Sequence, residues 1–263
     1  MFGLREKINE VNRIVVKVGT STLTYDNGKL NLGRIDKLAR TIADIKNRGI
    51  EVVLVSSGAI GVGVGKLGLK EKPTLTREKQ AAAAVGQCEL MYLYDKMFSE
   101  YGYKTGQVLL TRDVIDNTER KNNVTNTFNT LLDMHVVPVV NENDAVSIDE
   151  IVIGDNDTLS AVVATIVGAD LLVILTDIDG LYDKDPRKNS DAKRISEVEQ
   201  ITNEIKQMAG GAGSNRGTGG MFTKVTAAEM ASESGIFTVV CNGENPTILY
   251  DIIEGKDVGT LFK

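Results

Sequence analysis

Short apolar runs alternate with amphipathic stretches along most of the chain. Six runs, mostly rich in β-branched residues, predict buried strands at residues 13–18, 51–55, 104–110, 136–140, 170–175 and 235–241. Between the first two runs, positions 32, 35, 38, 39, 42 and 45 are apolar, which is the spacing of an amphipathic helix. A strand, a helix and a second strand in so short a segment form a βαβ unit, whose strands are parallel. The pattern therefore predicts an α/β fold built on parallel strands.

Helical spacing recurs between the later strands. It covers residues 75–100, 117–134, a segment starting at about 159, and residues 201–208 and 221–234. The first of these regions, which forms one or two helices, is rich in Ala and Met and is expected to pack in the core or between subunits. A chain of 263 residues with 42% hydrophobic residues can bury a full core, so we expect one large domain.

Parallel sheets bind ligands at the carboxyl ends of their strands. Polar segments follow four of the predicted strands at that end. They are the glycine-rich loops at 19–21 and 57–68, the stretch at 141–157 that is rich in Asp, Glu and Asn, and the segment that begins with Thr176 and Asp177. The functional edge of the sheet is therefore expected to carry all four.

Lys17 is anomalous, because it lies inside the first predicted strand. An ammonium group among Val side chains costs several kcal/mol to bury unless an anion meets it, on the order of the penalty for unpaired polar groups or more. The alternative is a lysine whose head reaches solvent at the end of the strand. Gly19, Thr20 and Ser21 follow, and they supply free amides and hydroxyls of the kind that bind anions.

Lys224 lies in the first turn of the helix predicted at 221–234, after a glycine-rich segment at 210–220. The amino end of a helix already carries about half a positive charge, so a lysine there is disfavoured by roughly 0.3–1 kcal/mol. A bound anion would reverse that sign. Glycines, a helix start and a lysine together indicate a phosphate site, although their order is not that of a P-loop.

Two nucleotide motifs are absent in their usual form. Gly63, Gly65 and Gly68 match G-x-G-x-x-G, but they begin well beyond the strand end and lack the expected acidic residue on a following strand. No glycine lies five residues before Gly65-Lys66, so there is no Walker A motif. A tight Ser-Ser-Gly turn at 56–58 remains, which either binds a carboxylate or phosphate or simply starts a helix.

Charge and composition exclude several classes of function. The net charge is -6, and no run of Lys and Arg indicates nucleic-acid binding or an anionic membrane surface. No apolar segment reaches 18 residues and the first residues lack a secretion signal, so we expect a cytoplasmic protein. Cys88 and Cys241 are expected to be reduced, mostly buried thiols, and His135 is expected to be structural.

The chemistry that fits these residues is phosphoryl transfer. If the sheet brings Lys17, Lys224 and the stretch 141–157 together, cations can neutralise a polyphosphate and carboxylates can order the lysines or bind an ammonium. No histidine base is available, which phosphoryl transfer tolerates because it depends mainly on positioning and charge stabilisation. A carboxylate acceptor needs no deprotonation at neutral pH.

Six motifs in order along the chain carry a family resemblance. They are K-V-G-T-S at 17–21, S-S-G-A-I at 56–60, V-N-E-N-D-A-V at 140–146, G-D-N-D at 154–157, L-T-D-I-D-G-L-Y at 175–182 and G-T-G-G-M-F-T-K at 217–224. Together they resemble the amino acid kinase family and, within it, the kinases that phosphorylate the γ-carboxylate of glutamate. The resemblance covers nearly the whole chain.

The resemblance implies an αβα sandwich around a mostly parallel, roughly eight-stranded sheet. Residues 1–263 would form a single domain, with a glutamate-binding lobe at about 1–168 and a nucleotide-binding lobe at about 169–263. Many members append a PUA domain, and we expect the form without it. The implied reaction converts ATP and L-glutamate to ADP and γ-glutamyl phosphate, the first step of proline biosynthesis. Mg²⁺ would travel with ATP without a protein metal ligand, proline would inhibit, and the protein would be a homo-oligomer, a dimer or a tetramer.

Roles for individual residues also follow from the resemblance. The implied catalytic residues are Lys17, Lys224 and Asp157, with Asp157 orienting the lysines. The implied glutamate-binding residues are Ser57, Gly58, Asn141, Asp144 and Asn156. The implied ATP-binding residues are Lys17, Gly19, Thr176, Asp177, Thr218, Gly219, Gly220, Met221, Phe222, Thr223 and Lys224. Residues 147–153 would form a hairpin or flap that connects the two functional parts of the stretch 141–157.

Two alternatives remain at this point. Related kinases of the same fold act on aspartate, N-acetylglutamate, carbamate or UMP; Asp144 favours a free amino acid, because an acetylated amine would leave its charge unpaired. The other alternative is a catalytically silent protein that binds nucleotide or amino acid. The presence of Lys17, Lys224 and Asp157 argues against it, because a silent binder has less need of them.

Overall fold

A computed structural model describes residues 3–25, 29–111, 114, 117–146, 156–210 and 220–263. One eight-stranded sheet forms the centre, in the order β3-β4-β2-β1-β5-β7-β8-β6. The strands are β1 (Arg13–Val18), β2 (Glu51–Ser56), β3 (Thr105–Leu110), β4 (Val137–Glu142), β5 (Leu171–Thr176), β6 (Glu197–Val198), β7 (Phe237–Asn242) and β8 (Thr260–Phe262). The predicted α/β fold with a mostly parallel, eight-stranded sheet is confirmed.

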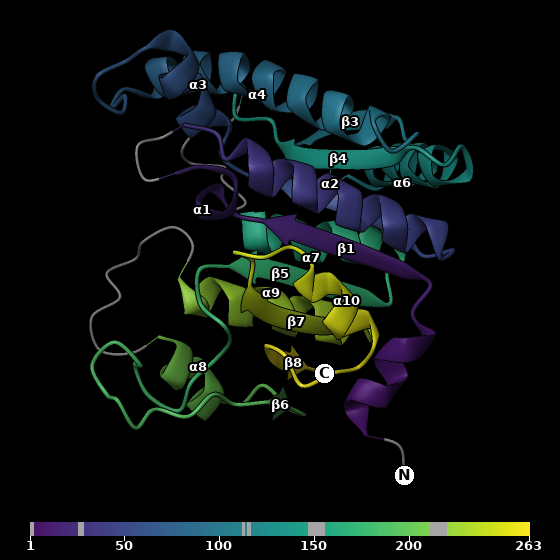
Figure 1. Ribbon diagram of the computed structural model, residues 1–263, viewed down its shortest axis with the longest axis vertical. Helices are drawn as coiled ribbons and strands as arrows, with labels where there is room; N and C mark the ends of the chain where they lie inside the picture. Colours follow the sequence, from purple (N-terminus) through teal and green to yellow (C-terminus); the bar gives the residue numbers. More distant parts are fainter. Residues whose placement is uncertain (1–2, 26–28, 112–113, 115–116, 147–155, 211–219) are drawn as a thin grey trace.

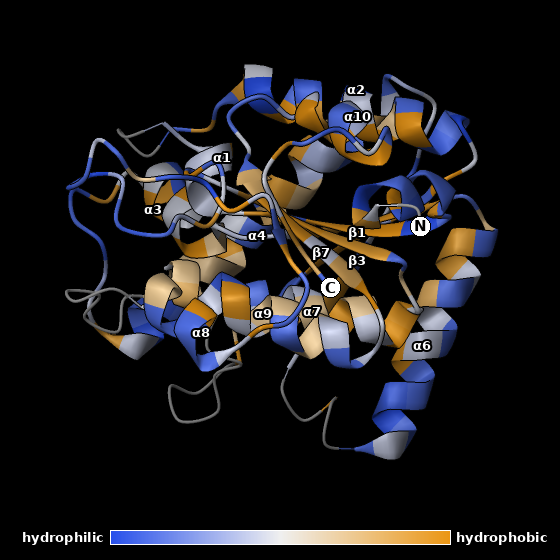
Figure 2. Ribbon diagram, turned by 90° about the horizontal axis from the view of Figure 1, so that it is seen from below, coloured by the Kyte–Doolittle hydropathy of each residue, from blue (hydrophilic) through white to orange (hydrophobic). Residues whose placement is uncertain are grey.

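Helices cover both faces of the sheet, as Figures 1 and 2 show. They are η1 (Leu4–Glu10), α1 (Thr20–Leu23), α2 (Leu32–Asn47), α3 (Ala59–Leu67), α4 (Thr76–Ser99), α6 (Thr118–Asp133), α7 (Asn156–Val167), α8 (Asn203–Ala209), α9 (Met221–Glu233) and α10 (Ile248–Ile253). In Figure 2 the strands run between α2 and α10 on one side and α6, α7 and α9 on the other. The result is the three-layered sandwich that the resemblance implied.

The sheet has a hydrophobic core on each of its faces. Strand β1 lies in the middle of the sheet and contributes side chains to both cores. It pairs in parallel with β2 on one side and with β5 on the other. Its side chains alternate: Ile14, Val16 and Val18 join the core beneath α2, whereas Val15 joins the core beneath α7 and α9. Lys17 has the parity of Val15, so it leaves the strand on the face that α7 covers.

The sequence prediction differs from the structure at several boundaries. Strands β6 and β8 were not predicted, since they have only two and three residues, too few for a periodic pattern. Strand β8 pairs antiparallel with β7 and parallel with β6. Strand β4 continues to Glu142, and α7 already includes Asn156, before the predicted start at about residue 159. The region 75–100 is a single helix, α4.

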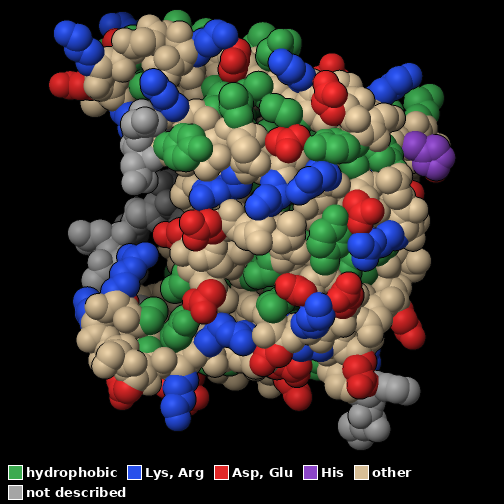
Figure 3. Space-filling model, in the orientation of Figure 1, with side chains coloured by type: hydrophobic (Ala, Val, Ile, Leu, Met, Phe, Trp, Pro, Cys, Tyr) green, Lys and Arg blue, Asp and Glu red, His purple; other side chains and the backbone are tan. Residues whose placement is uncertain are grey.

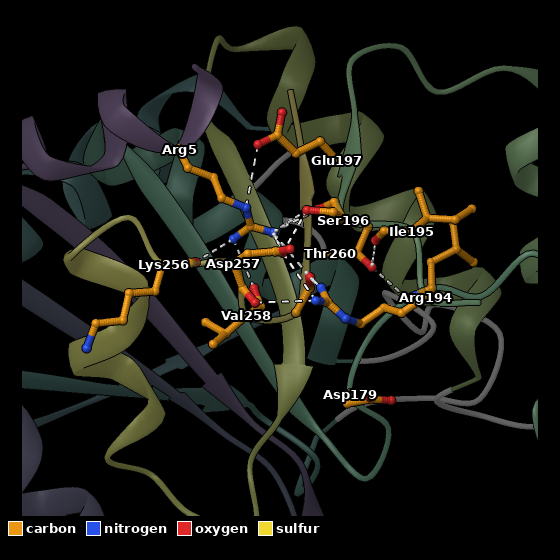
Figure 4. Close-up of polar contacts among 12 residues, drawn as sticks. Arg5, Asp179, Arg194, Ile195, Ser196, Glu197, Lys256, Asp257, Val258 and Thr260 are labelled. Carbon is orange, nitrogen blue, oxygen red and sulfur yellow. Dashed lines mark hydrogen bonds and ion pairs between the residues drawn. The ribbon is translucent and has the colours of Figure 1, made fainter. Parts of the chain in front are cut away.

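Arg5, in the helix η1 near the amino terminus, forms hydrogen bonds with the residues just before the short strands β6 and β8. Arg5 is 8% exposed, and its guanidinium donates to the carbonyl oxygens of Lys256, Val258, Ser196 and Gly259 at 2.8–3.2 Å. In Figure 4, Arg5 and Arg194 approach the segment 257–260 from opposite sides, and both pair with the carboxylate of Asp257. Burial lowers the pKa of Arg5, and the carboxylates of Asp257 and Glu197 oppose that shift.

Helices α3 and α4 touch through their backbones. A β-carbon added at Gly86 on α4 would overlap the carbonyl group of Ala59, and one added at Gly63 on α3 would overlap the carbonyl group of Ala82. Two glycines facing each other's helix in this way permit a contact that any larger residue would prevent. This contact fixes the start of α3, and with it the turn at Gly58.

We expect Gly86→Ala to lower the free energy of unfolding by about 3 kcal/mol, in the range of overpacked core substitutions, because the atoms that the new β-carbon would overlap belong to the backbone of α3 and cannot rotate away as a side chain can. Urea unfolding followed by circular dichroism measures the change. Gly33→Ala on α2 is the matched control, since its β-carbon would come no nearer than 3.9 Å to another atom. That control should be neutral or stabilising by about 0.5–1 kcal/mol. If Gly86→Ala and Gly33→Ala unfolded at the same urea concentration, the prediction would be contradicted.

The charged side chains, the two cysteines and His135 were also the subject of predictions from the sequence. Acidic and basic side chains intermingle on the face shown in Figure 3. The prediction that both thiols are mostly buried was wrong for Cys88: both cysteines are free, but only Cys241 is buried, whereas Cys88 on α4 is exposed. Among the described residues, none of the helices combines the length and apolar character needed to cross a membrane. His135 is exposed in the turn before β4, with a φ of 58°.

Candidate active site

Asp157 is the centre of the site. It lies in the first turn of α7 and its side chain is fully buried. The ammonium of Lys17 lies 2.7 Å from its Oδ1, and the ammonium of Lys224 lies 3.0 Å from its Oδ2. The structure thus brings together the three residues for which the resemblance implied a catalytic role.

Charge balance explains how these groups remain buried. Burial alone would raise the pKa of Asp157, but the positive charges of Lys17 and Lys224 outweigh it, and the pKa lies below its usual value. Lys17 and Lys224 are only 7% and 3% exposed. One carboxylate between two ammonium groups leaves a net positive charge, which suits the binding of a polyanion.

Each lysine is positioned by a different part of the fold. Lys17 projects from the central strand toward α7. Lys224 lies on α9, which packs against α7, and Gly220 caps that helix. The hydroxyl of Thr223 lies 2.8 Å from Asp157 Oδ2 and 2.7 Å from the carbonyl oxygen of Gly220, so the start of α9 is tied to the carboxylate.

Hydrogen-bonded amides extend from this centre toward α4. The Nδ2 of Asn156 lies 2.8 Å from the Ser57 hydroxyl, 3.0 Å from the Ser56 carbonyl oxygen and 2.9 Å from Asn141 Oδ1, so its two hydrogens are shared among these three acceptors. The Nδ2 of Asn141 in turn donates to Gln87 Oε1 at 2.9 Å. Asn156 therefore joins Asn141 and Ser57, and the resemblance assigned all three to glutamate binding.

Gly58 sets the turn that presents Ser57. Its φ is +92°, which disfavours residues with a side chain, and it is the residue before α3. A β-carbon there would lie 3.3 Å from the side chain of Thr20. The two glycine-containing loops after β1 and β2 therefore lie against each other. Gly19 is close to Lys17, since its β-carbon would lie 3.7 Å from Lys17 Nζ.

Asp144 lines a cavity of about 380 Å³ between α4 and the ends of β3 and β4. The cavity is lined by Ala59, Ala83, Ala84, Gln87, Cys88, Met91, Gln107, Leu109, Glu142, Asn143, Asp144 and Ala145. Burial, followed by the nearby carboxylate of Glu142, raises the pKa of Asp144 to about 6. A carboxylate in this setting gains from a cationic partner.

A second pocket, of about 420 Å³, lies on the other side of the lysine pair. It includes Lys224, Gly220 and Met221 from the start of α9, and Thr176 and Asp177 from the end of β5. Of the residues implied to bind ATP, these five line the pocket. Phe222 is 49% exposed beside Gly210. Thr218 and Gly219, like the predicted connecting segment at 147–153, lie outside the described residues.

Several residues that line these two cavities or support the loops beside them were not identified from the sequence. Lys184, Arg187 and Lys188 line the second pocket, and Arg187 lies 3.7 Å from Asp177. Their signal was the D-K-D-P-R turn, which follows the carboxyl end of a strand. Gln87 and Tyr94 were read only as part of a packing helix, yet Tyr94 hydrogen-bonds Ser56 at 2.9 Å.

Within the part of the chain that the structure describes, there is no group of three or more His, Cys, Asp or Glu side chains placed to hold a metal ion. Both oxygens of the Asp157 carboxylate face lysine ammonium groups instead. The acidic character of 141–157 is accordingly divided: Asp157 orders the lysines, and Asp144 belongs to the cavity beside α4.

Residues 12–242 match the amino acid kinase family. A solved UMP kinase from Ureaplasma parvum superimposes with a TM-score of 0.67 over 96% of this chain and 98% of its own, at 15% sequence identity, which supports the fold. This chain belongs to the amino acid kinase family.

Curated relatives narrow the comparison within that family. The chain is 62% identical to the glutamate 5-kinase of Clostridium perfringens over 263 residues, covering 98% of both proteins. It is 56% identical to the glutamate 5-kinase of Clostridium tetani, covering 99% of this chain and 98% of that one. The resemblance inferred from the six motifs is confirmed: these glutamate 5-kinases match this chain over nearly its whole length.

Proposed function

We propose that the protein transfers the γ-phosphoryl group of ATP to the γ-carboxylate of L-glutamate, giving ADP and γ-glutamyl phosphate, the first step of proline biosynthesis. The observation that carries the proposal is the buried Lys17–Asp157–Lys224 cluster between two pockets. One pocket is lined by the start of α9 and suits the nucleotide, and the other contains a carboxylate suited to the ammonium of an amino acid. The identity to glutamate 5-kinases supports the choice of acceptor.

The reaction requires two anions to approach each other. The acceptor carboxylate is already ionised at neutral pH, so the site needs no general base. Lys17 and Lys224 neutralise the phosphates, and Lys224 faces the oxygens of the group in transfer, where charge stabilisation is most effective. Asp157 holds both ammonium groups in place before the substrates arrive. Mg²⁺ enters with ATP as part of the substrate and supplies additional neutralisation of the phosphates.

Glutamate lies with its γ-carboxylate toward Asn156 and the lysines and its α-ammonium toward Asp144. Ser57 and Asn141 complete the polar wall between these two ends. The residues that touch the nucleotide are Thr176, Asp177 and the segment 218–224. This arrangement divides the domain into a glutamate-binding lobe at about 1–168 and a nucleotide-binding lobe at about 169–263. Proline, which also carries an α-ammonium and a carboxylate, inhibits by occupying the glutamate site.

An assay of ADP release tests the proposal. Glutamate, aspartate, N-acetylglutamate and UMP are compared as acceptors, and hydroxylamine traps any acyl phosphate as a hydroxamate. We expect ADP and hydroxamate in equal amounts with glutamate, and little with the others. Turnover with UMP or N-acetylglutamate but none with glutamate would refute the proposed reaction. The same assay with millimolar proline tests the inhibition, which is refuted if the glutamate dependence is unchanged.

We expect the KM for glutamate to rise as the pH falls through about 6, because protonation removes the Asp144 charge that pairs with the ammonium. Glutamate itself keeps its γ-carboxylate ionised down to about pH 5. Asp144→Asn should raise the KM at neutral pH by about tenfold or more and abolish this dependence. Initial rates at several pH values measure both effects.

Glu142→Gln is the matched control for Asp144. Removing the neighbouring negative charge lowers the pKa of Asp144, so the rise in KM should shift to lower pH while remaining visible. A wild-type KM that is flat between about pH 5 and pH 8 would remove Asp144 from ammonium binding.

A further inference from the structure

Gln87 on α4 connects the amide chain to the cavity of Asp144. Its Oε1 accepts a hydrogen bond from Asn141 at 2.9 Å, and the same side chain lines the cavity that contains Asp144 and Glu142. Asn141, which is 1% exposed, lies between Gln87 and Asn156. Gln87 is therefore in contact with the glutamate-binding residues on one side and with the cavity on the other.

Two backbone groups determine which way these amides face. The N–H of Glu142 can only donate, and it donates to Asn141 at 2.9 Å, so the acceptor there is Oδ1. The carbonyl of Ser56 can only accept, so Asn156 faces it with Nδ2. Asn141 consequently directs Nδ2 to Gln87, which must present Oε1. The polar atom of Gln87 that remains is Nε2, a donor of two hydrogen bonds.

A donor suits this cavity if an amino acid binds there. The α-ammonium and the α-carboxylate of glutamate are attached to the same carbon, so an ammonium on Asp144 brings the α-carboxylate into the same cavity. Asp144 and Glu142 are both carboxylates and repel that group. A neutral amide donor on the opposite wall compensates without neutralising Asp144. A lysine or arginine in this position would instead pair with Asp144 and compete with the substrate.

We propose that Gln87 is a substrate-binding residue, whose Nε2 donates to the α-carboxylate of glutamate while its Oε1 holds Asn141 in register with Asn156. This proposal rests on the proposed function, since it names a group that recognises the same acceptor. It assigns to one side chain of α4 the selection of an acceptor with a free α-carboxylate.

Gln87→Glu separates substrate recognition from a purely structural role. The substitution keeps an oxygen that can accept from Asn141, but it replaces the amide donor by a negative oxygen. We expect the KM for glutamate to rise by about ten- to a hundredfold, the range for a hydrogen bond to a charged group. The KM for ATP should stay within about threefold, because the nucleotide pocket lies on the other side of the lysine pair.

The α-amide of glutamate supplies a readout that a structural role would not move. This analogue keeps the γ-carboxylate acceptor, but it replaces the α-carboxylate by an amide that can donate. The wild type should prefer glutamate, whereas Gln87→Glu should lose or reverse that preference in kcat/KM, because the new side chain accepts from the analogue. Glu89→Gln, on the same helix and paired with Lys66, is the control and should leave the preference unchanged.

An unchanged ratio of glutamate to α-amide in Gln87→Glu overturns the proposal and leaves Gln87 as a support for Asn141 alone. If that variant does not fold, as judged by circular dichroism and thermal unfolding, Gln87→Met decides by the same ratio, since it removes the donor without adding charge. Its preference for glutamate should fall, and a wild-type ratio again overturns the proposal. Failure of the proposed function is distinguishable, because the wild type would then release no ADP with glutamate.

Discussion

Replacing Lys224 by alanine should lower kcat by about 10²–10³-fold, the effect of removing one preorganised group that stabilises charge in a transition state. The ammonium faces the group in transfer, where negative charge is most concentrated as the bonds change. In the ground state the other contacts of the nucleotide pocket persist, so the KM for ATP should change by no more than about threefold. Initial rates of ADP release at varied ATP and glutamate give both constants.

Lys256→Ala is the control for Lys224→Ala. Lys256 follows α10, and its ammonium pairs with the exposed carboxylates of Asp251 and Glu254. It carries the same charge in solvent, so both kinetic constants should be those of the wild type. If Lys224→Ala retained wild-type turnover, or lost only ATP affinity, Lys224 would have no role in the transfer step.

Replacing Asp157 by asparagine should lower the free energy of unfolding by about 3–5 kcal/mol, the cost of breaking a buried ion pair by removing one partner. Lys17 and Lys224 would then be left as two buried like charges without a carboxylate between them. Asparagine and aspartate have nearly the same size, so the loss of stability reports the missing charge and not a change in packing. Urea unfolding at neutral pH measures it.

Asp251→Asn provides the comparison for Asp157. Its carboxylate pairs with Lys256 at 2.7 Å, but both side chains are about half exposed, so the change should be below about 1 kcal/mol. The pH dependence of the free energy of unfolding gives a second test of the role of Asp157. The pKa of Asp157 is depressed in the folded protein, so its contribution to stability is present at neutral pH and is lost as the pH falls below the ordinary range of an aspartate. Equal stability of wild type and Asp157→Asn at neutral pH would contradict this account.

The sequence allowed the lysine pair to be predicted because each lysine violated a local rule. Lys17 interrupts a run of Val residues, and Lys224 lies at the amino end of a helix, which already carries a partial positive charge. In both places the positive charge of the lysine is stabilised only if an anion lies nearby. The structure resolves the choice left open for Lys17, which is buried against Asp157 and does not reach solvent. That Asp157 would be the shared partner was an implication of the family resemblance and not of the pattern.

Other parts of the site could not be predicted, for equally physical reasons. Gln87 and Tyr94 occur in a helix whose spacing predicts only packing, and their importance depends on which loops lie opposite. Asn156 and Asp157 are polar, so the apolar pattern placed the start of α7 too late. Arg5 bonds with residues about 190 and 250 positions away, and no local signal reports such contacts.

Asp157 joins residues that are remote in sequence, and this separation has a consequence for folding. Lys17 belongs to the first strand, whereas Lys224 is 67 residues beyond Asp157 in a later helix. Contacts at such separation carry a large loop-closure cost and form slowly. Helices such as α2 and α4 can regain local structure while the cluster is still open. During refolding, recovery of catalysis would therefore mark completion of the whole sheet, and far-UV circular dichroism would return to its native value earlier.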